Sequence, residues 1–185
     1  DQPSNTEFDG TDSAEVVIVG GGGTGISAAL TAVEERAESV ILVEKLPELG
    51  VFMRMKTGQF SAANTTLQKE QGLTEDSVER YTEEILKFGN SNGGHPIEYL
   101  VESYAKNATE AWEWIYQMGV KDYPFMTDSE GNKVIVNPGH MPYEYNRTYV
   151  PLPKEDSRLG NPAIEVMLNE LAKKDQIRVY TSVAG

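Results

Sequence analysis

Three glycines and one carboxylate early in the chain have the residue types and spacing that bind a nucleotide. Gly20, Gly22 and Gly25 form the pattern Gly-x-Gly-x-x-Gly. In this pattern the first glycine permits a tight turn, the second lets backbone approach a pyrophosphate, and the third lets a helix pack closely on a strand. Glu44 follows about 20 residues later, where a carboxylate can accept hydrogen bonds from both hydroxyls of an adenosine ribose. Together they predict a site for the ADP part of a dinucleotide.

Two apolar runs and an amphipathic stretch are placed to position these residues. Val16–Val19 and Val40–Val43 are continuous apolar runs, typical of parallel strands buried on both faces. Between them Ile26, Ala29, Leu30 and Val33 recur at helical spacing. The order strand, glycine turn, helix, strand and acid is the context that the motif requires. The alternative, an α/β unit that is merely rich in glycine, gives no reason for this complete order.

Composition limits the classes of protein to which the chain can belong. Its 185 residues carry a formal net charge of −13, which disfavours nucleic acid and anionic membrane surfaces as partners. No apolar run approaches the roughly 20 residues needed to cross a bilayer. With no cysteine and two histidines, thiol chemistry is excluded and a metal site is not expected. The sequence therefore predicts a globular nucleotide-binding protein with no metal, no nucleic-acid partner and no membrane span.

The remaining elements follow from periodicity, caps and turn residues. Residues 1–13 are polar and acidic and predict a flexible tail that does not resemble a signal peptide. The expected elements are a helix from Thr74, a loop at 89–94, a helix from His95-Pro96 to a stop at Gly119, a small β-hairpin from 122–126 and 133–136, a helix at 161–174 with Asn161 as N-cap, and a strand at 177–181. Of Trp112 and Trp114, one should face the core and the other its edge.

Two polar regions have open interpretations. Residues 139–154 contain His140, Tyr143, Tyr145, Arg147 and Tyr149, which either line a polar pocket or cover a core. Arg54 and Lys56 are either cations near phosphates or solvated loop residues. The small residues of 57–63 could let backbone run against a flat ligand.

The number of expected strands is small for a doubly wound domain. Such domains have about five or six strands, whereas three sheet strands and one accessory hairpin are expected here. The predicted fold class is therefore α/β with a parallel sheet, a helical segment and a small β-hairpin, apparently truncated within a larger fold.

With these pieces in order, the sequence resembles the fumarate reductase/succinate dehydrogenase flavoprotein family, particularly its single-chain soluble bacterial reductases. The resemblance is carried by VVIVGGGGTGISAA, VILVEKLPELG, TGQFSAA, the helix ending in IYQMGV, and Arg147 with the helix and strand up to Val183. It implies that residues 14–185 are the N-terminal part of a Rossmann-like FAD-binding domain. It also implies FAD as cofactor and hydride transfer from flavin N5 to an activated alkene, an unsaturated carboxylate or ketone.

The resemblance further implies where FAD would bind. Gly20, Gly22, Gly23, Thr24 and Gly25 would hold the pyrophosphate, with Glu44 on the ribose and Lys45 beside the adenosine. Met53, Thr57, Gly58 and Gln59 would run past the pyrophosphate toward the flavin ring. The backbone of Val183 would read the adenine edge.

The sequence also departs from the family pattern. Val51-Phe52-Met53 stands where the family has Gly-Asn-Ser or Gly-Asn-Thr, so a hydroxyl and an amide that would bond phosphate are missing. The capping domain, the catalytic side chains and the segment that closes over the flavin would lie beyond residue 185. Catalytic residues are therefore unknown within this chain, which alone is expected to be inactive.

Partners and alternatives follow from the same comparison. A small-molecule substrate is expected, with an electron-donor protein or the remainder of the same polypeptide as a further partner. The compartment is unknown, either cytoplasmic or exported after removal of a signal. The alternatives are an NAD-binding Rossmann dehydrogenase fragment and a folded, non-catalytic assembly module without cofactor.

Overall fold

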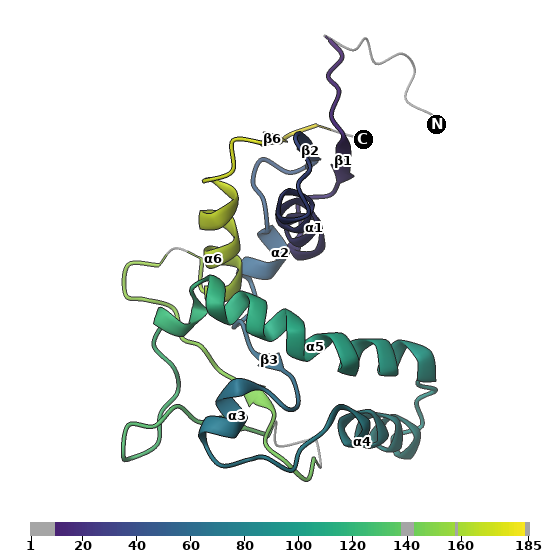
Figure 1. Cartoon of the computed structure of the whole chain (residues 1–185), viewed down its shortest axis with the longest axis vertical. Coiled ribbons are helices and arrows are strands. Elements are labelled where there is room, and N and C mark those ends of the chain that lie inside the picture. Colours follow the sequence, from purple (N-terminus) through teal and green to yellow (C-terminus); the bar gives the residue numbers. More distant parts are fainter. Residues whose placement is uncertain (1–9, 138–142, 158, 184–185) are drawn as a thin grey trace. The chain divides into compact units, whose positions relative to one another are not determined.

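The computed structural model describes residues 10–137, 143–157 and 159–183 (Figure 1). Its chain divides into two units. The first unit comprises Asp1–Val51 and Leu168–Gly185, and the second comprises Phe52–Met167. Helix α6 (Pro162–Leu171) has residues in both units. No helix within the described ranges is long and apolar enough to cross a membrane.

The first unit is built on a parallel sheet. Its strands are β1 (Val16–Val19), β2 (Val40–Val43) and β6 (Ile177–Tyr180), in the order β1-β2-β6. Helix α1 (Gly23–Glu34) connects β1 to β2 and contacts both strands. Its apolar stripe is buried through Ile26, Ala29 and Leu30. The strand–helix–strand unit and the terminal parallel strand predicted from the sequence are confirmed.

The prediction that both apolar runs are buried on both faces is wrong for β1. Val17 is 57% exposed and Val19 is 74% exposed, whereas Val40, Ile41 and Leu42 of β2 are buried. The difference follows from topology, because β2 pairs on both sides while β1 pairs only with β2 among the described residues. An apolar run alone does not distinguish an edge strand from a central strand.

The end of the predicted tail contacts the sheet. Asp12 accepts two hydrogen bonds from the Arg178 guanidinium, at 3.0 and 3.1 Å, and one from the Tyr180 hydroxyl at 2.6 Å. Arg178 also donates to the carbonyl oxygen of Ser13 at 2.7 Å. Residues 1–9 of the predicted tail lie outside the described residues.

The second unit contains longer helices and a small antiparallel sheet. Its strands β3 (Phe60–Ser61), β4 (Ile135–Val136) and β5 (Thr148–Tyr149) are ordered β3-β5-β4. Its remaining elements are α2 (Val51–Arg54, beginning at the last residue of the first unit), α3 (Thr66–Glu70), α4 (Val78–Ser91), α5 (Glu98–Met118) and the 3₁₀ helix η1 (Val120–Asp122).

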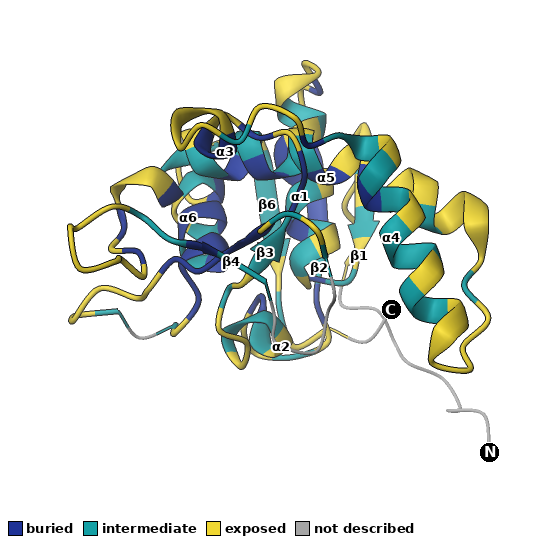
Figure 2. Ribbon diagram, turned by 90° about the horizontal axis from the view of Figure 1, so that it is seen from below, coloured by how far each residue is buried: buried dark blue, intermediate teal, exposed yellow. Residues whose placement is uncertain are grey.

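Several predicted helix boundaries differ from the observed ones, and α5 begins at Glu98, after Ile97, rather than at His95-Pro96. Helix α4 begins after Ser77, whose hydroxyl accepts from the Arg80 amide at 3.2 Å, rather than at Thr74. It continues through Gly89 to Ser91, so the predicted loop at 89–94 is wrong for its first half. Figure 2 shows α4 with intermediate and exposed positions along its length, and Tyr81 is its buried residue. The stop of α5 at Gly119 is confirmed, with φ of 150° that favours glycine.

The core of the second unit is centred on Trp112. This side chain is 2% exposed and stacks on the Tyr149 ring with centroids 4.2 Å apart. Phe60 and Phe125 also contact its ring. Trp114 is partly buried at the edge of the same cluster, as the spacing of the two tryptophans predicts.

The predicted hairpin is only partly present. Thr127 and Lys133 form an isolated antiparallel bridge around the turn at 128–131. However, β4 pairs with β5, a strand that the sequence interpretation did not include. Two-residue strands show no alternation that a sequence pattern could reveal.

The structure answers the open interpretation of residues 139–154 for Arg147 and Tyr149, whereas Tyr143 lines a cavity of about 420 Å³. The Arg147 guanidinium has no exposed surface and donates to both carboxylate oxygens of Asp76, at 2.8 and 2.6 Å, and to Glu84. The guanidinium also lies over the Tyr81 ring, 4.7 Å from its centroid. Arg147 and Tyr149 are therefore core residues, and His140 lies outside the described residues.

Candidate functional site

The glycine turn has the geometry that its pattern requires. Gly20 has φ of 107°, and its amide donates to the Val43 carbonyl at 2.7 Å, which holds the end of β1 against β2. A Cβ at Gly25 would lie 1.8 Å from the carbonyl oxygen of Gly20. Helix α1 therefore packs against the turn at a distance that only glycine allows.

Gly21 is a requirement that the sequence reasoning missed. A Cβ there would lie 2.3 Å from Cδ2 of Leu49 and 3.0 Å from Cβ of Glu44. The Gly21 amide donates to Oε2 of Glu44 at 2.6 Å, and its carbonyl accepts from the Gly50 amide at 2.7 Å. The run of four glycines, Gly20 to Gly23, was the available signal, but the motif assigns no role to this position.

The start of α1 is open to an anion. Gly22 is its N-cap, without a side-chain hydrogen bond to the first turn, and that turn has no acidic residue. Gly22 and Thr24 are exposed, and a Cβ on Gly22 would meet no atom within 4 Å. The first amides of a helix have no partner within the helix and favour negative charge. Gly22 to Gly25 thus fit a pyrophosphate group.

Glu44 is a buried and organised acceptor at the end of β2. Its side chain is 9% exposed, and Oε1 accepts from the Leu46 amide at 2.8 Å while Oε2 accepts from Gly21. The backbone hydrogen bonds from Leu46 and Gly21 lower the pKa of Glu44 and keep it ionised at neutral pH. Each carboxylate oxygen has a second lone pair, so capacity for ribose hydroxyls remains.

The two residues expected near the adenosine lie beside Glu44. Lys45 follows it with an exposed side chain. The Val183 amide donates to the Glu44 carbonyl at 3.1 Å, which extends the pairing of β6 with β2. The amide of Val183 is therefore used within the sheet, which makes its carbonyl the group to test for contact with adenine.

The second unit brings together the residues expected along the flavin. Met53, Thr57, Gly58 and Gln59 line one cavity of about 490 Å³. Its other lining residues are Met55, Lys56, Phe60, Ile115, Asn161, Ala163 and Met167. Gly58 has φ of 75°, a conformation that favours glycine. The cavity is mainly apolar with a few polar groups, a lining that suits a flat ring with hydrogen-bonding edges.

Asn161 joins this cavity to the start of α6. It caps the helix as the sequence predicts, its Oδ1 accepting from the Ala163 amide at 3.1 Å. Its Nδ2 also donates to the Met53 carbonyl at 2.9 Å, across 108 positions of sequence. The cap could be predicted from local pattern, but the contact with Met53 could not.

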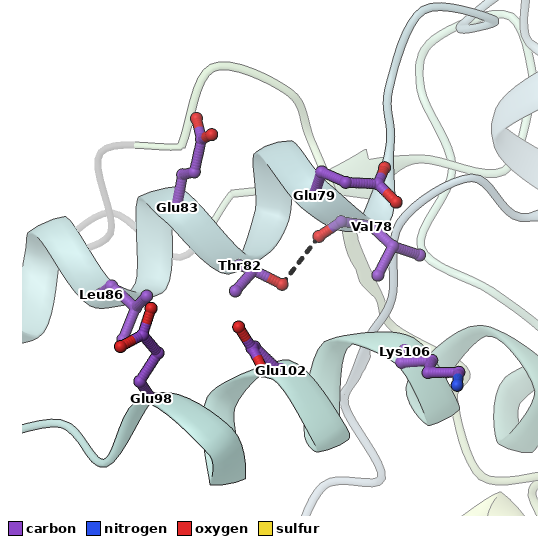
Figure 3. Close-up of a pocket in the computed structure, with 8 residues that line it drawn as sticks. All are labelled: Val78, Glu79, Thr82, Glu83, Leu86, Glu98, Glu102 and Lys106. Carbon is purple, nitrogen blue, oxygen red and sulfur yellow. Dashed lines mark hydrogen bonds between the residues drawn. The ribbon is translucent and has the colours of Figure 1, made fainter.

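A separate groove of about 550 Å³ lies between α4 and α5 (Figure 3). Four carboxylates line it, from Glu79, Glu83, Glu98 and Glu102, with Lys106 as the one basic residue of the lining. This groove contains none of the predicted site residues, and its charge disfavours an anionic cofactor. The described residues contain no group of three or more His, Asp or Glu that could hold a metal ion.

Known proteins match this chain over most of its length. The model of the FAD binding domain family matches residues 15–184. The urocanate reductase of Eggerthella lenta is 37% identical over 126 residues, covering 68% of this chain and 20% of that protein. The NADH:fumarate oxidoreductase of Klebsiella pneumoniae is 38% identical over 108 residues, covering 58% and 11%.

Solved structures also match most of this chain but only part of their own length. A flavocytochrome c3 fumarate reductase in its open conformation superposes with a TM-score of 0.66 at 24% identity. This likeness covers 91% of the present chain and 26% of that chain. The chain thus spans about a tenth to a quarter of the length of these relatives. The match over residues 15–184 shows that this chain belongs to the FAD binding domain family, with FAD as its cofactor.

Proposed function

We propose that this chain is the FAD-binding part of a flavin-dependent oxidoreductase that reduces an activated alkene. The single observation that carries the proposal is the arrangement around Gly21 and Glu44. An ionised carboxylate, held by two backbone amides, stands next to a helix start with no side-chain cap. This arrangement offers acceptors for a ribose and donors for a pyrophosphate at one turn.

Each unit has its own part in this proposal. In the first unit Gly20, Gly22, Gly23, Thr24 and Gly25 would bind the pyrophosphate, Glu44 the ribose, and Lys45 and the Val183 carbonyl the adenosine. In the second unit the segment Met53–Gln59 would line the flavin. Bound FAD would supply the hydride for the reduction, as cofactors carry the redox chemistry that side chains cannot.

The substrate class rests on the relatives. Two of them are named for reduction of urocanate and of fumarate, which are unsaturated carboxylates. We therefore propose an unsaturated carboxylate, with a conjugated ketone as the second class to test. The proton donor is not assigned to any residue of this chain.

The test of the cofactor proposal is titration of the purified protein with FAD. Saturable quenching of flavin fluorescence and a visible flavin spectrum are expected. Glu44→Gln should weaken binding about tenfold or more, because it removes one charged acceptor from the ribose. Glu38→Gln, which changes an exposed carboxylate of the same unit, is the matched control. Saturable binding of NAD without binding of FAD would contradict the proposal.

The reaction is tested separately on flavin-loaded protein. Reduced viologen is the electron donor, and urocanate, fumarate, acrylate and an enone are offered in turn. Oxidation of the viologen that depends on one of these alkenes supports the proposed reaction. Flavin binding without any turnover would leave the cofactor assignment intact and would agree with the expectation that this chain alone is inactive.

A further inference from the structure

One side chain, 108 positions away in the sequence, contacts the Met53–Gln59 segment. Asn161 is 1% exposed, and both ends of its amide are used. Oδ1 accepts from the amides of Ala163 at 3.1 Å and Ile164 at 3.4 Å, and Nδ2 donates to the Met53 carbonyl at 2.9 Å. The reverse amide orientation would place NH₂ against two N–H donors, so the bonding pattern fixes the assignment.

The same side chain also constrains Gly58. A Cβ at Gly58 would lie 2.8 Å from Oδ1 of Asn161 and 3.2 Å from Cδ of Pro162. The backbone therefore passes over the cap closely enough to exclude any side chain. Asn161 thus fixes the segment twice, by a hydrogen bond at Met53 and by contact at Gly58.

The position of this contact gives it a consequence for the cofactor. The cavity of about 490 Å³ is lined by Met53, Gly58 and Asn161 itself. A buried amide with both ends bonded has little freedom to rotate and cannot exchange its partners for water. The shape of the cavity wall therefore depends on the bond between Asn161 and Met53.

We propose that Asn161 is a positioning residue that clips the Met53–Gln59 segment to the start of α6 and so sets the shape of the flavin side of the FAD site. This inference rests on the proposed function, because it takes the cavity as the place of the flavin. It adds a residue that neither the glycine motif nor the resemblance assigned. Asn161 acts through the backbone of Met53 and Gly58.

The experiment separates the hydrogen bond from Asn161 to the Met53 carbonyl from the capping of α6 by the same side chain. Asn161→Asp keeps an oxygen for the Ala163 amide but turns a second oxygen toward the Met53 carbonyl. Asn161→Ser keeps a capping hydroxyl but is too short to reach Met53. Ser77→Ala is the matched control, since it removes an N-cap hydrogen bond from α4 without contact with the segment. All four proteins are compared in FAD titration and in amide hydrogen exchange without FAD.

If Asn161 positions the Met53–Gln59 segment, FAD titration and hydrogen exchange should change together. Asn161→Asp and Asn161→Ser should raise the dissociation constant for FAD about tenfold, the usual effect of one lost buried hydrogen bond. They should also accelerate exchange in peptides that cover residues 53–59 and change the visible flavin spectrum. Ser77→Ala should change neither the affinity nor the exchange of residues 53–59.

Two results would overturn the inference. One is unchanged exchange at residues 53–59 in both Asn161 variants, which decides the matter even if the wild-type protein does not bind FAD. The other is an equal loss of FAD affinity in Ser77→Ala, which would show that general destabilisation explains the effect. Failure of wild-type FAD binding contradicts the proposed function. Hydrogen exchange at residues 53–59 still tests whether Asn161 positions the segment.

Discussion

Gly22 and Gly25 belong to one motif but have different structural environments. A Cβ at Gly25 would collide with the Gly20 carbonyl oxygen at 1.8 Å, whereas a Cβ at Gly22 would meet nothing within 4 Å. The requirement at Gly25 is therefore part of the fold. At Gly22 the fold imposes no such requirement, and one would arise only if a ligand approaches the open start of α1, as the proposed function implies. Substitution by alanine should separate these two requirements.

Gly25→Ala should destabilise the first unit by about 3 kcal/mol, because the turn or the helix must move to remove the overlap. Gly22→Ala should cost less than about 1 kcal/mol, since φ of −76° suits alanine. Both should lose most FAD affinity, measured by flavin fluorescence. Hydrogen exchange of residues 16–44 reports the stability. Full FAD affinity in Gly22→Ala would show that no phosphate approaches this position.

Glu44 makes stability dependent on pH. Hydrogen bonds from the Leu46 and Gly21 amides lower its pKa in the folded state below the ordinary value of 4.5. A carboxyl with a lowered folded pKa stabilises the fold above its unfolded pKa, and this stability is lost as the pH falls through the folded pKa. The wild-type urea midpoint should therefore fall as the pH drops below about 4.5, the unfolded value.

The Glu44→Gln variant isolates this contribution. Its urea midpoint should fall less steeply over the same acidic range, because the side chain no longer titrates. Circular dichroism follows the unfolding, and Glu38→Gln is measured in parallel. Equal acid sensitivity of wild type and Glu44→Gln would assign the effect to other carboxyls.

At the scale of single residues, the sequence predicted roles that depend on local chain geometry. The turn at Gly20, the packing at Gly25 and the cap at Asn161 are each set by neighbours within a few positions. Gly21 could not be assigned, because its need for glycine comes from the Leu49 side chain, which the fold brings to it. The contact of Asn161 with Met53 depends on tertiary structure in the same way.

Among the elements of the second unit, α4 and β5 are held together by a buried ion pair. Arg147 bonds Asp76 just before α4 and Glu84 within it, and both Arg147 and Asp76 have no exposed side-chain surface. Arg147 directly precedes β5, so the same side chain aligns the strand that pairs with β3. Removing the cation would leave the Asp76 carboxylate buried with only the neutral donors of Gln68 and Ser77.

Arg147→Met should destabilise the second unit by about 3–5 kcal/mol, the cost of an uncompensated buried charge. Arg80→Met is the matched control, because Arg80 pairs with Glu144 at an exposed position and should contribute less than about 1 kcal/mol. Tryptophan fluorescence during urea unfolding reports this unit, since both tryptophans lie within it. Similar losses in the two variants would contradict the buried network.

The elements themselves were predicted to different extents for physical reasons. The strands β1 and β2 are continuous apolar runs and α1 has helical apolar periodicity, and these elements were found at the expected positions. The short strands β3, β4 and β5 form because Tyr149 and Thr148 pair with residues far away in sequence, which no local pattern records. Gly89 was read as part of a loop, yet the helix continues past it, since tertiary contacts outweigh the modest helix penalty of one glycine.

For the chain as a whole, the net charge opposes the binding of an anionic cofactor. The chain carries −13, and FAD is an anion through its pyrophosphate. Under the proposed function, each unit has local positive charge that would favour FAD: the start of α1 and Lys45 in the first unit, and Lys56 in the cavity lining of the second. Long-range repulsion and local attraction have different ranges, so salt can distinguish them.

The association rate of FAD should rise about twofold or more between 10 and 150 mM salt, because screening removes repulsion that acts beyond about 8 Å. Lys56→Ala should lower the rate and keep the same direction of salt dependence, because the rest of the charge is unchanged. Stopped-flow quenching of flavin fluorescence measures both rates. A rate that falls with salt in the wild type, and loses that dependence in Lys56→Ala, would instead show that local cations near the cavity control the approach of FAD.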